Sequence, residues 1–248
     1  MENIKKRLRR ITLVRLAREL MIGIISFTDS PFKSIMRNIN DANISYVIDV
    51  GANVGQFGID IRRNGFSGQI VSFEPVNEVY KTLANTVSKH KPWVAFQLGI
   101  GSAESIQDIN VSGNDGLSSS LLQMGKIHMS NFPKSLTVSS QKVSVSTLDK
   151  QLEVLGIDPG KILLKVDVQG FEAEVLKGAA KSLSKIPLCF LEASIIPLYE
   201  GEITLLPILN LLSESGHEVI DVFRGVKTKN GQLLQVDILT KLTVKKPD

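Results

Sequence analysis

The chain has 248 residues, of which 43% are hydrophobic and 22% are charged. These values are typical of a single globular domain that buries a sizeable core. The formal net charge is +4, but the excess of Lys and Arg lies near the start of the chain, so a nucleic-acid-binding protein is not indicated. The one cysteine, Cys189, excludes an internal disulfide framework and a cysteine-rich zinc site, and it fits a reducing, cytoplasmic compartment.

Residues 1–27 predict a basic amphipathic helix with an imperfect apolar stripe. We favour the interpretation that this helix packs on the body of the protein or pairs with a second subunit, which would make the protein a homo-oligomer. The alternative is peripheral contact with a membrane surface. No run of about 18 apolar residues occurs, so we expect no membrane span. The helix-start signal at 29–31 predicts a second helix over 31–40, and together these helices form an N-terminal helical segment, 1–43.

From Tyr46 onward, strand-like and helix-like segments alternate, which predicts an α/β fold with a mostly parallel sheet and helices on both faces. The expected strands are 46–50, 69–73, 94–98, 162–167, 188–193, 217–223 and 235–241. The expected helices are 55–64, 77–89, 147–155, 171–183 and 204–215. Lys229-Asn230-Gly231 is a hairpin turn signal between the last two strands, so we expect one antiparallel strand in the sheet.

Residues 99–146 interrupt this alternation with a segment rich in Ser, Asn and Gly. A long irregular insertion in a compact domain is usually functional. Two β-prone pieces, 106–111 and 142–146, predict an antiparallel hairpin inside it. We therefore expect a substrate-facing insertion within the larger domain, which spans residues 44–248.

The first strand ends in an acid and opens into a glycine-spaced turn, with the sequence Asp49-Val50-Gly51-Ala52-Asn53-Val54-Gly55. A strand–turn–helix of this kind presents backbone N–H groups and the positive end of a helix dipole at the carboxyl edge of the sheet. The spacing Gly51-x-x-x-Gly55 is neither the dinucleotide motif nor a P-loop. A carboxylate at Asp49 would repel a pyrophosphate but attract a cationic amino group. The ligand that we infer is therefore S-adenosyl-L-methionine.

Two further strand ends suit the rest of that cofactor. Glu74 follows the second strand and lies 23 residues after Gly51, close to the interval at which an acid meets a ribose in nucleotide-binding α/β units. A carboxylate can accept hydrogen bonds from both ribose hydroxyls at once. The third strand leads into small residues that end at Ser102, where an adenine ring would lie flat against the backbone.

Two more acids are predicted on the same edge of the sheet. Asp167 ends the fourth strand and Glu192 the fifth, so with Asp49 and Glu74 they make four carboxylates along one crevice. Converging carboxylates raise one another's pKa, and a raised pKa suits an acid that takes a proton from a hydroxyl. We assign this catalytic role to Asp167 and treat His128 as the histidine to test as a base. Oxygen ligands would also suit Mg²⁺ or Ca²⁺, but we assign no metal.

Five motifs along the chain resemble those of the FkbM-type methyltransferases. They are the glycine turn at 49–55, Phe73-Glu74-Pro75, the segment Lys165-Val166-Asp167-Val168-Gln169-Gly170-Phe171-Glu172 with Val175-Leu176-Lys177-Gly178-Ala179, the pair Leu191-Glu192-Ala193 and Leu198-Tyr199-Glu200-Gly201, and the Ser-rich run from Asn114 to Leu121. The resemblance covers roughly residues 44–241. One departure is Gln169, where the family commonly carries Glu, and it weakens any role that needs a third carboxylate there.

The resemblance implies a class I, Rossmann-like methyltransferase fold with a seven-stranded sheet that uses S-adenosyl-L-methionine. It implies that Asp49 and the turn residues Gly51, Asn53 and Gly55 hold the methionine portion, and that Glu74 holds the ribose. The expected reaction is O-methylation of a hydroxyl on a sugar, glycan or other natural product. Segments that include Ser119, Glu192 and Tyr199 are expected to wall the pocket of this small-molecule or glycan acceptor.

Three alternatives remain from the sequence. One is a catalytically silent protein with a cofactor-binding fold, docked to a membrane or an assembly through its basic N-terminus. Another is an NAD-dependent oxidoreductase, which the turn spacing opposes. The third is an RNA methyltransferase, which is disfavoured because the body lacks a basic face with interleaved aromatic residues.

Overall fold

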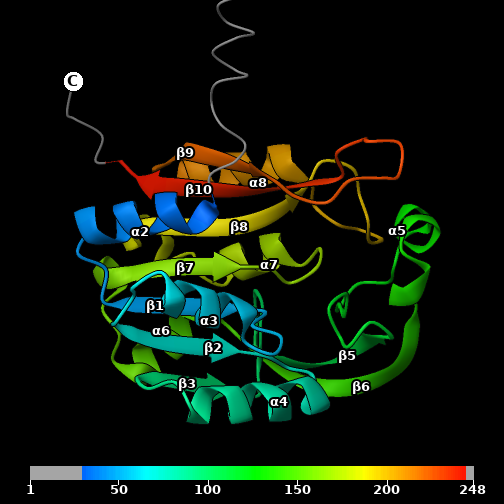
Figure 1. The fold of residues 1–248 in the computed structure, drawn as a ribbon, viewed down its shortest axis with the longest axis horizontal. Helices are drawn as coiled ribbons and strands as arrows, with labels where there is room; N and C mark the ends of the chain where they lie inside the picture. The colour runs from blue at the N-terminus through cyan, green and yellow to red at the C-terminus, as the bar shows by residue number, and fades with distance from the viewer. Residues whose placement is uncertain (1–29, 244–248) are drawn as a thin grey trace, which may run out of the picture. The chain divides into compact units, whose positions relative to one another are not determined.

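Residues 30–243 are described by a computed structural model of the chain (Figure 1). The helix predicted over 1–27 lies outside the described residues. The second predicted helix is present as α2, Pro31–Asp41, and its buried Ile35 and Ile39 share a core with the first strand of the sheet. We predicted α2 as part of the N-terminal helical segment, and it packs on the sheet.

The centre of the fold is a seven-stranded sheet in the order β3-β2-β1-β7-β8-β10-β9. Five strands of this sheet run parallel to one another: β1 (Tyr46–Val50), β2 (Gln69–Phe73), β3 (Trp93–Phe96), β7 (Ile162–Val166) and β8 (Leu188–Ser194). β10 (Gln235–Leu242) lies antiparallel between β8 and β9 (His217–Arg224). The predicted fold class, a mostly parallel sheet with one antiparallel strand, is confirmed. Because the strand order reverses between β1 and β7, the carboxyl ends of these two strands form the switch point at which such sheets bind ligands.

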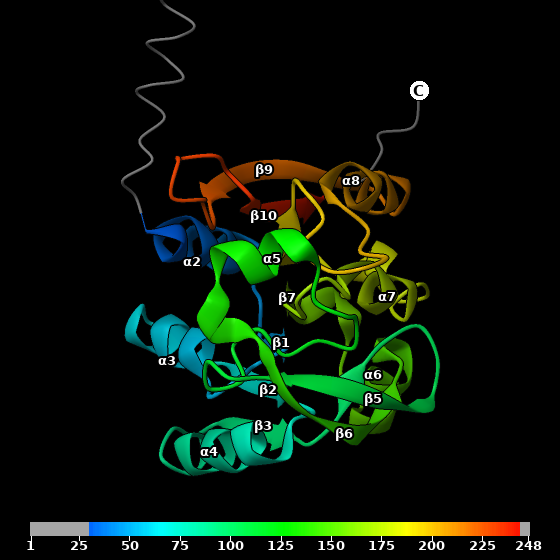
Figure 2. The ribbon, with the colours of Figure 1, turned by 90° about the vertical axis from the view of Figure 1, so that its right-hand side faces the viewer.

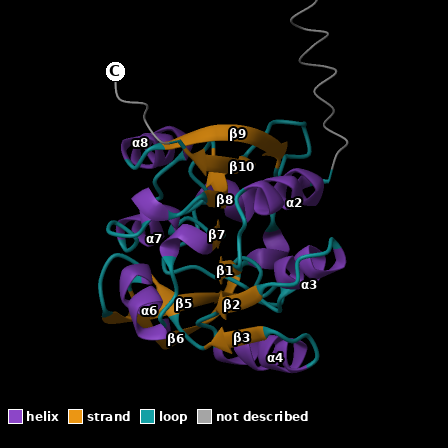
Figure 3. Cartoon of the chain, turned by 90° about the vertical axis from the view of Figure 1, so that its left-hand side faces the viewer, coloured by secondary structure: helices purple, strands orange, loops and turns teal. Residues whose placement is uncertain are grey.

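Helices cover both faces of the sheet, which Figure 3 shows edge-on. α3 (Gln56–Arg63) and α4 (Asn77–Ser88) share one core with α2, whereas α6 (Leu148–Leu155), α7 (Glu172–Lys177) and α8 (Leu205–Glu214) share the other. Successive strand residues alternate between the two cores, so that Val47 belongs to the first and Ile48 to the second. Within the described part of the chain, no helix is long and apolar enough to cross a membrane.

The insertion forms a second, three-stranded sheet in the order β4-β6-β5. β5 (Ser105–Ser112) and β6 (Thr137–Ser146) are antiparallel, which confirms the predicted hairpin, and β4 (Gly99–Ile100) pairs parallel with β6. Between β5 and β6 the chain forms a loop over 113–125 and the short helix α5, Lys126–Asn131. Figure 2 shows α5 and this loop in front of the carboxyl ends of the central strands.

α7 is shorter than the helix predicted over 171–183. The helix ends before Gly178, where an added Cβ would lie 2.0 Å from a backbone carbonyl oxygen of the segment after β4. Beyond that point Asp149 accepts hydrogen bonds from the backbone N–H groups of Lys181 and Ser182, at 2.9 and 3.0 Å. These tertiary hydrogen bonds add to the short turns that the backbone makes over 179–183.

The hairpin that the Lys-Asn-Gly turn predicts joins β9 to β10. In its turn the N–H of Gly231 donates to the carbonyl of Thr228 at 3.0 Å, and Gly231 has a left-handed φ of 83°. The returning strand pairs Gln235 with Ser194 at the end of β8. It therefore brings its first residues to the carboxyl edge of the sheet.

Gly58 provides a test of the packing of α3 on Trp93. A Cβ added at Gly58 would lie 2.2 Å from the indole Cη2 atom. In an exposed helix a Gly-to-Ala change stabilises by about 1 kcal/mol, but here we expect Gly58→Ala to destabilise by about 1–3 kcal/mol because the core becomes overpacked. Urea denaturation measures this change, with Thr82→Ala on the exposed side of α4 as the control. Equal or greater stability of Gly58→Ala would contradict the close packing.

Candidate active site

The glycine turn after β1 is held against two neighbouring strands. The N–H groups of Gly51 and Ala52 both donate to the carbonyl of Phe73 at 3.1 Å. Gly51, Asn53 and Gly55 have positive φ values of 73°, 47° and 95°. A Cβ added to Gly51 would lie 1.9 Å from the backbone oxygen of Asp167. A glycine is required at 51 because the turn passes so close to the chain that leaves β7.

Below this turn lies a buried ion pair. Asp49 is fully buried, and its Oδ1 lies 3.0 Å from Nζ of Lys165, which is also buried. Nζ also donates to the carbonyl of Gly51 at 2.8 Å. Lys165 of β7 therefore binds both the carboxylate of Asp49 in β1 and the first residue of the turn. On its other side, Asp49 Oδ2 accepts a hydrogen bond of 3.3 Å from the hydroxyl of Ser72. The sequence placed Asp49 in the crevice, whereas its contacts here are with the core below the turn.

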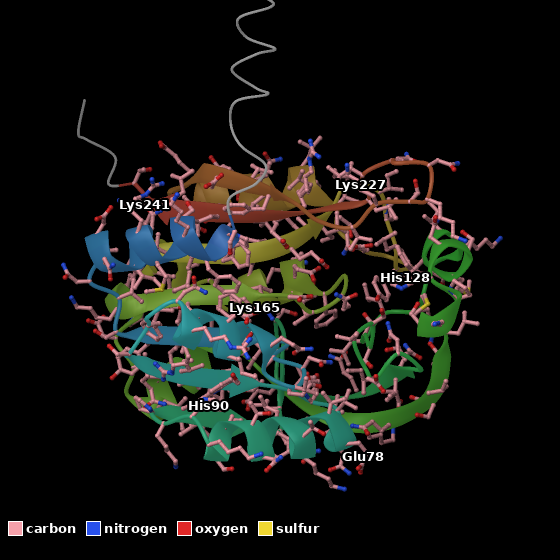
Figure 4. The ribbon with its side chains drawn as sticks, in the orientation of Figure 1. Glu78, His90, His128, Lys165, Lys227 and Lys241 are labelled. Carbon is pink, nitrogen blue, oxygen red and sulfur yellow. The ribbon has the colours of Figure 1, made fainter. Side chains whose placement is uncertain are left out.

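The charge of Lys165 is maintained by its acidic neighbours. Burial lowers the pKa of its ammonium group, but Asp49 and then Asp167 more than offset this, so that the net shift is upward. Asp167 Oδ2 lies 3.8 Å from Nζ. Figure 4 labels Lys165 near the middle of the sheet. One cation therefore serves two of the acids predicted on this edge.

Glu74 follows β2 and turns its carboxylate back toward the glycine turn. Its Oε2 accepts from the N–H of Asn53 at 3.0 Å, and its Oε1 accepts from the N–H of Val76 at 2.9 Å. Burial raises the pKa of this carboxyl to about 7, although both hydrogen bonds act in the opposite direction. Each oxygen uses one lone pair in these bonds and keeps another for a ligand.

Glu172 fixes the loop between β7 and α7. This buried residue accepts at Oε1 from the N–H groups of Val168 and Gly170, at 3.0 and 3.2 Å. Burial raises its pKa to about 7. The loop is thereby set in one conformation, and the side chain of Asp167 remains 38% exposed at its start.

Glu192 of β8 lies in a group of buried or half-buried polar residues. Its Oε2 accepts from the side-chain amides of Gln235 and Gln169, and its register partner on β10 is Asp237. Burial, followed by the charges of Asp167 and Asp237, raises the pKa of Glu192 well above its usual value. Burial and then Asp167 raise the pKa of Asp237 to about 7.

The insertion contacts the loop after β7 and the segment after β8. The hydroxyl of Ser120 donates to the carbonyl of Gln169 at 2.6 Å, and the hydroxyl of Tyr199 lies 3.1 Å from the carbonyl of Ser118. The loop also reaches the glycine turn, since a Cβ added to Gly116 would lie 3.8 Å from Nδ2 of Asn53. The insertion thus covers the edge at which the predicted residues meet.

Two predicted residues have other surroundings. Ser102 is exposed and donates to Glu174, and it lines a cavity of about 710 Å³ beside α6 together with Lys150 and Lys181. Its contacts therefore do not join it to Asp49 or Glu74. Ser119 is half-buried, and its hydroxyl accepts from the N–H of Ser112 at 3.1 Å, which shapes the insertion loop.

His128 belongs to the small core of the insertion. Its Nε2 lies 2.9 Å from the hydroxyl of Ser135, and its ring meets the ring of Tyr199 edge to face with 5.1 Å between centroids. Burial lowers its pKa, and Figure 4 places it far from Lys165, in the insertion. No group of three or more potential metal-binding His, Cys, Asp or Glu side chains occurs among residues 30–243.

Sequence reasoning missed Gln235 and Asp237. Both lie on β10, which pairs with β8 so that Asp237 stands opposite Glu192. A polar residue at every second position of a strand, here 235 and 237, was the available signal. The register of the hairpin, which the sequence does not reveal, decides that these two residues reach the site.

The strand order, the glycine turn after β1, the acid after β2 and the acid after β7 define a Rossmann-like methyltransferase. The sequence profile described as the Methyltransferase FkbM domain matches residues 49–226. The chain therefore belongs to the FkbM methyltransferase family, and it is an S-adenosylmethionine-dependent methyltransferase. This confirms the resemblance and the cofactor that the sequence indicated.

Two curated proteins illustrate the relationship. The chain is 27% identical over 188 residues to 2-O-methyltransferase NoeI of Sinorhizobium fredii, a match that covers 73% of this chain and 76% of NoeI. It is 27% identical over 145 residues to Methyltransferase 1 of Beauveria bassiana, which covers 54% of this chain and 58% of that protein.

Among solved structures, the chain is similar to Sp1610 of Streptococcus pneumoniae in complex with S-adenosyl-L-methionine. The identity is 9%, the TM-score is 0.45, and the match covers 87% of this chain and 75% of that one. Precorrin-6y C5,15-methyltransferase of Geobacter metallireducens gives 10% identity and a TM-score of 0.43, with 86% and 87% of the two chains covered.

The geometry at the edge of the sheet fits this cofactor. The glycine turn ends at the N-terminus of α3, whose backbone N–H groups and dipole favour a carboxylate such as that of the methionine portion. The free lone pairs of Glu74 suit two vicinal hydroxyls. The carboxylate of Asp167 is partly exposed at the same edge, and a negative charge suits a cationic sulfonium. Phosphate-rich cofactors would be repelled by the same acids.

Lys165→Met tests the buried ion pair. The substitution leaves the carboxylate of Asp49 buried without its cation, and we expect it to destabilise the protein by about 3–5 kcal/mol. Guanidinium denaturation at pH 7.5 measures the loss. The double variant Asp49→Asn with Lys165→Met removes both charges and should recover a large part of it. If Lys165→Met alone is as stable as the wild type, the pair does not hold the turn.

Proposed function

We propose that the protein transfers a methyl group from S-adenosylmethionine to a hydroxyl of a sugar, a glycan or another natural product. The observation that carries this proposal is the carboxylate of Asp167, which is 38% exposed beside the glycine turn while Asp49 and Glu172 are buried. A hydroxyl is a weak nucleophile at neutral pH, and a carboxylate within reach assists by accepting its proton. The similarity to a protein named as a 2-O-methyltransferase also favours oxygen as the acceptor atom.

The turn residues Gly51, Asn53 and Gly55 would hold the methionine part of the cofactor, and Glu74 would accept hydrogen bonds from its ribose. Asp49 acts from below, since it holds Lys165, whose Nζ donates to the carbonyl of Gly51. Ser102 is left out of the proposed site because its hydroxyl donates to Glu174 of α7.

When bound, the cofactor supplies a methyl group on a positively charged sulfur, and transfer forms a C–O bond while the S–C bond breaks and its electron pair stays on sulfur. Because the methyl group is already activated, the protein mainly aligns the acceptor, a contribution of about 7–11 kcal/mol in favourable cases. Asp167 would take the hydroxyl proton at Oδ2, which lies 3.8 Å from Nζ of Lys165.

The acceptor would lie between the insertion and the carboxyl end of β8. Tyr199 and Glu192 come from the β8 side, and Ser119 belongs to the insertion loop that Ser120 and Tyr199 hold in place. This region holds the hydroxyl of Ser120, the amide of Gln169 and the carboxyl group of Glu192, which suit an acceptor with many hydroxyls. The alternative of a catalytically silent protein has no observation of its own in its favour.

Glu74→Gln tests the cofactor assignment. The amide places an N–H where the carboxylate now accepts from the N–H of Asn53 or Val76, and it loses charge-assisted hydrogen bonds to the ribose. We expect affinity for S-adenosylmethionine, measured by calorimetry, to fall by about 10- to 100-fold. Glu78→Gln is the control, because Glu78 is exposed on α4, away from Lys165 in Figure 4.

The pH dependence of binding gives a second reading of Glu74. Its folded-state pKa of about 7 means that the carboxyl is protonated below that value. Wild-type affinity should therefore weaken as the pH falls from 8 to 6, and Glu74→Gln should lack this dependence. Equal affinities for the wild type and Glu74→Gln at pH 8 would remove Glu74 from the cofactor site.

Transfer to hydroxyls is tested directly with a hydroxyl panel of methyl glycosides, oligosaccharides and hydroxylated polyketides, using S-adenosylmethionine with a labelled methyl group. We expect at least one product with a new methyl ether. Asp167→Asn should lower kcat by about 10²- to 10⁴-fold if the carboxylate accepts the proton, with cofactor affinity retained. Label found only on nitrogen or carbon of an acceptor from a cell extract would contradict O-methylation.

A further inference from the structure

The side chain of Gln169 contacts two carboxylates and a phenol. Its Nε2 lies 2.9 Å from Asp167 Oδ1 and 3.3 Å from Glu192 Oε2, and its Oε1 lies 3.0 Å from the hydroxyl of Tyr199. A carboxamide has two N–H donors and one carbonyl acceptor. With its nitrogen toward the two acids, the amide donates to both carboxyl groups and turns its carbonyl oxygen to the phenol.

The backbone at Gln169 is held in an unusual conformation. Its φ is 56°, in the left-handed region that a residue with a Cβ seldom adopts. The hydroxyl of Ser120 donates to its carbonyl at 2.6 Å, and Glu172 binds the N–H groups of the residues on either side of it. Strain of this kind persists where the surrounding contacts impose it, and it is often found at functional sites. Here it aims the amide at the pair of acids.

The amide is surrounded by ionisable groups from several elements. On the side of β7 they are Lys165, Asp167 and Glu172 of the following helix, and on the side of β8 and β10 they are Glu192, Tyr199, Glu202 and Asp237. Acids outnumber the cation in this group, so two carboxylates that approach each other need a neutral donor between them. Gln169 is that donor, and a glutamate in its place would add a further negative charge.

We propose that Gln169 is a positioning residue for methyl transfer, and this inference rests on the proposed O-methyltransferase function. Its amide holds Asp167 by Oδ1, which leaves Oδ2 to face Lys165 and the acceptor hydroxyl. The same amide links Asp167 to Glu192, and its oxygen lies 3.0 Å from the hydroxyl of Tyr199, whose one proton is shared between this oxygen and the carbonyl of Ser118 in the insertion. One side chain therefore orients Asp167, the proposed base, and contacts Tyr199, which borders the insertion over the acceptor pocket.

Gln169→Glu tests this role, because it keeps the size of the side chain but replaces two N–H donors with a negative charge. At pH 8 we expect kcat on the hydroxyl panel to fall by about 10²-fold, as expected for misplacement of a reacting group by about 1 Å. The ratio of variant to wild-type kcat should rise as the pH falls, since a protonated Glu can again donate to one acid. Cofactor affinity by calorimetry should stay at the wild-type value.

Two further variants complete the experiment. Gln232→Glu adds the same charge in the exposed turn between β9 and β10 and should match the wild type at every pH. Gln169→Met removes the donors without adding charge, and its loss of kcat should not diminish at low pH. If Gln169→Glu does not fold, Tyr199→Phe removes the hydroxyl that faces the amide oxygen and should lower kcat with cofactor affinity retained.

The outcomes separate the two claims. A wild type that binds the cofactor but methylates no hydroxyl would overturn the proposed function, and this inference with it. An active wild type whose Gln169→Glu variant has the wild-type kcat, or a loss that is constant with pH, would overturn the positioning role alone. An unchanged kcat in Tyr199→Phe would do the same where Gln169→Glu is not available as a folded protein.

Discussion

The buried ion pair between Asp49 and Lys165 is the interaction on which the rest of the site depends. An unpaired charge at either position would be costly in a core, so each residue requires the other. The pair links β1 to β7 at the point where the strand order reverses, and Lys165 also binds the carbonyl of Gly51. The glycine turn, the backbone of Asp167 that touches it and the carboxylate of Asp167 are thereby fixed relative to one another.

A second constraint is the crowding of acids at this edge. Glu74, Glu172, Glu192 and Asp237 all have pKa values raised mainly by burial. The structure keeps them together with neutral donors, which are backbone N–H groups for Glu74 and Glu172 and side-chain amides for Glu192. Gln169 is one of these amides, and it donates to two of the acids without adding a charge. The insertion covers these acids and is held there by the hydrogen bonds of Ser120 and Tyr199.

Much of this arrangement could be predicted, because the carboxyl ends of parallel strands meet at one edge of a sheet. Hydrophobic runs located β1, β2, β7 and β8, and an acid lies near the end of each strand or directly after it. The contacts of Asp49 could not be foreseen in full, since burial under the turn depends on the approach of β7. Asp237 was missed because the register of an antiparallel hairpin is set by tertiary packing. The hydrogen bond of Ser102 to Glu174 could not be predicted either, because it depends on how α7 packs against the segment after β4.

The central claim is that the turn fixed by Asp49 and Lys165 is the place where the cofactor binds and faces Asp167. A crystal structure with S-adenosylhomocysteine, the demethylated product, tests this most directly. The account predicts the ribose hydroxyls within hydrogen-bond distance of Glu74, the methionine portion against Gly51 and Gly55, and the sulfur on the side of Asp167. A product bound away from this turn, or a ribose with no contact to Glu74, would contradict it.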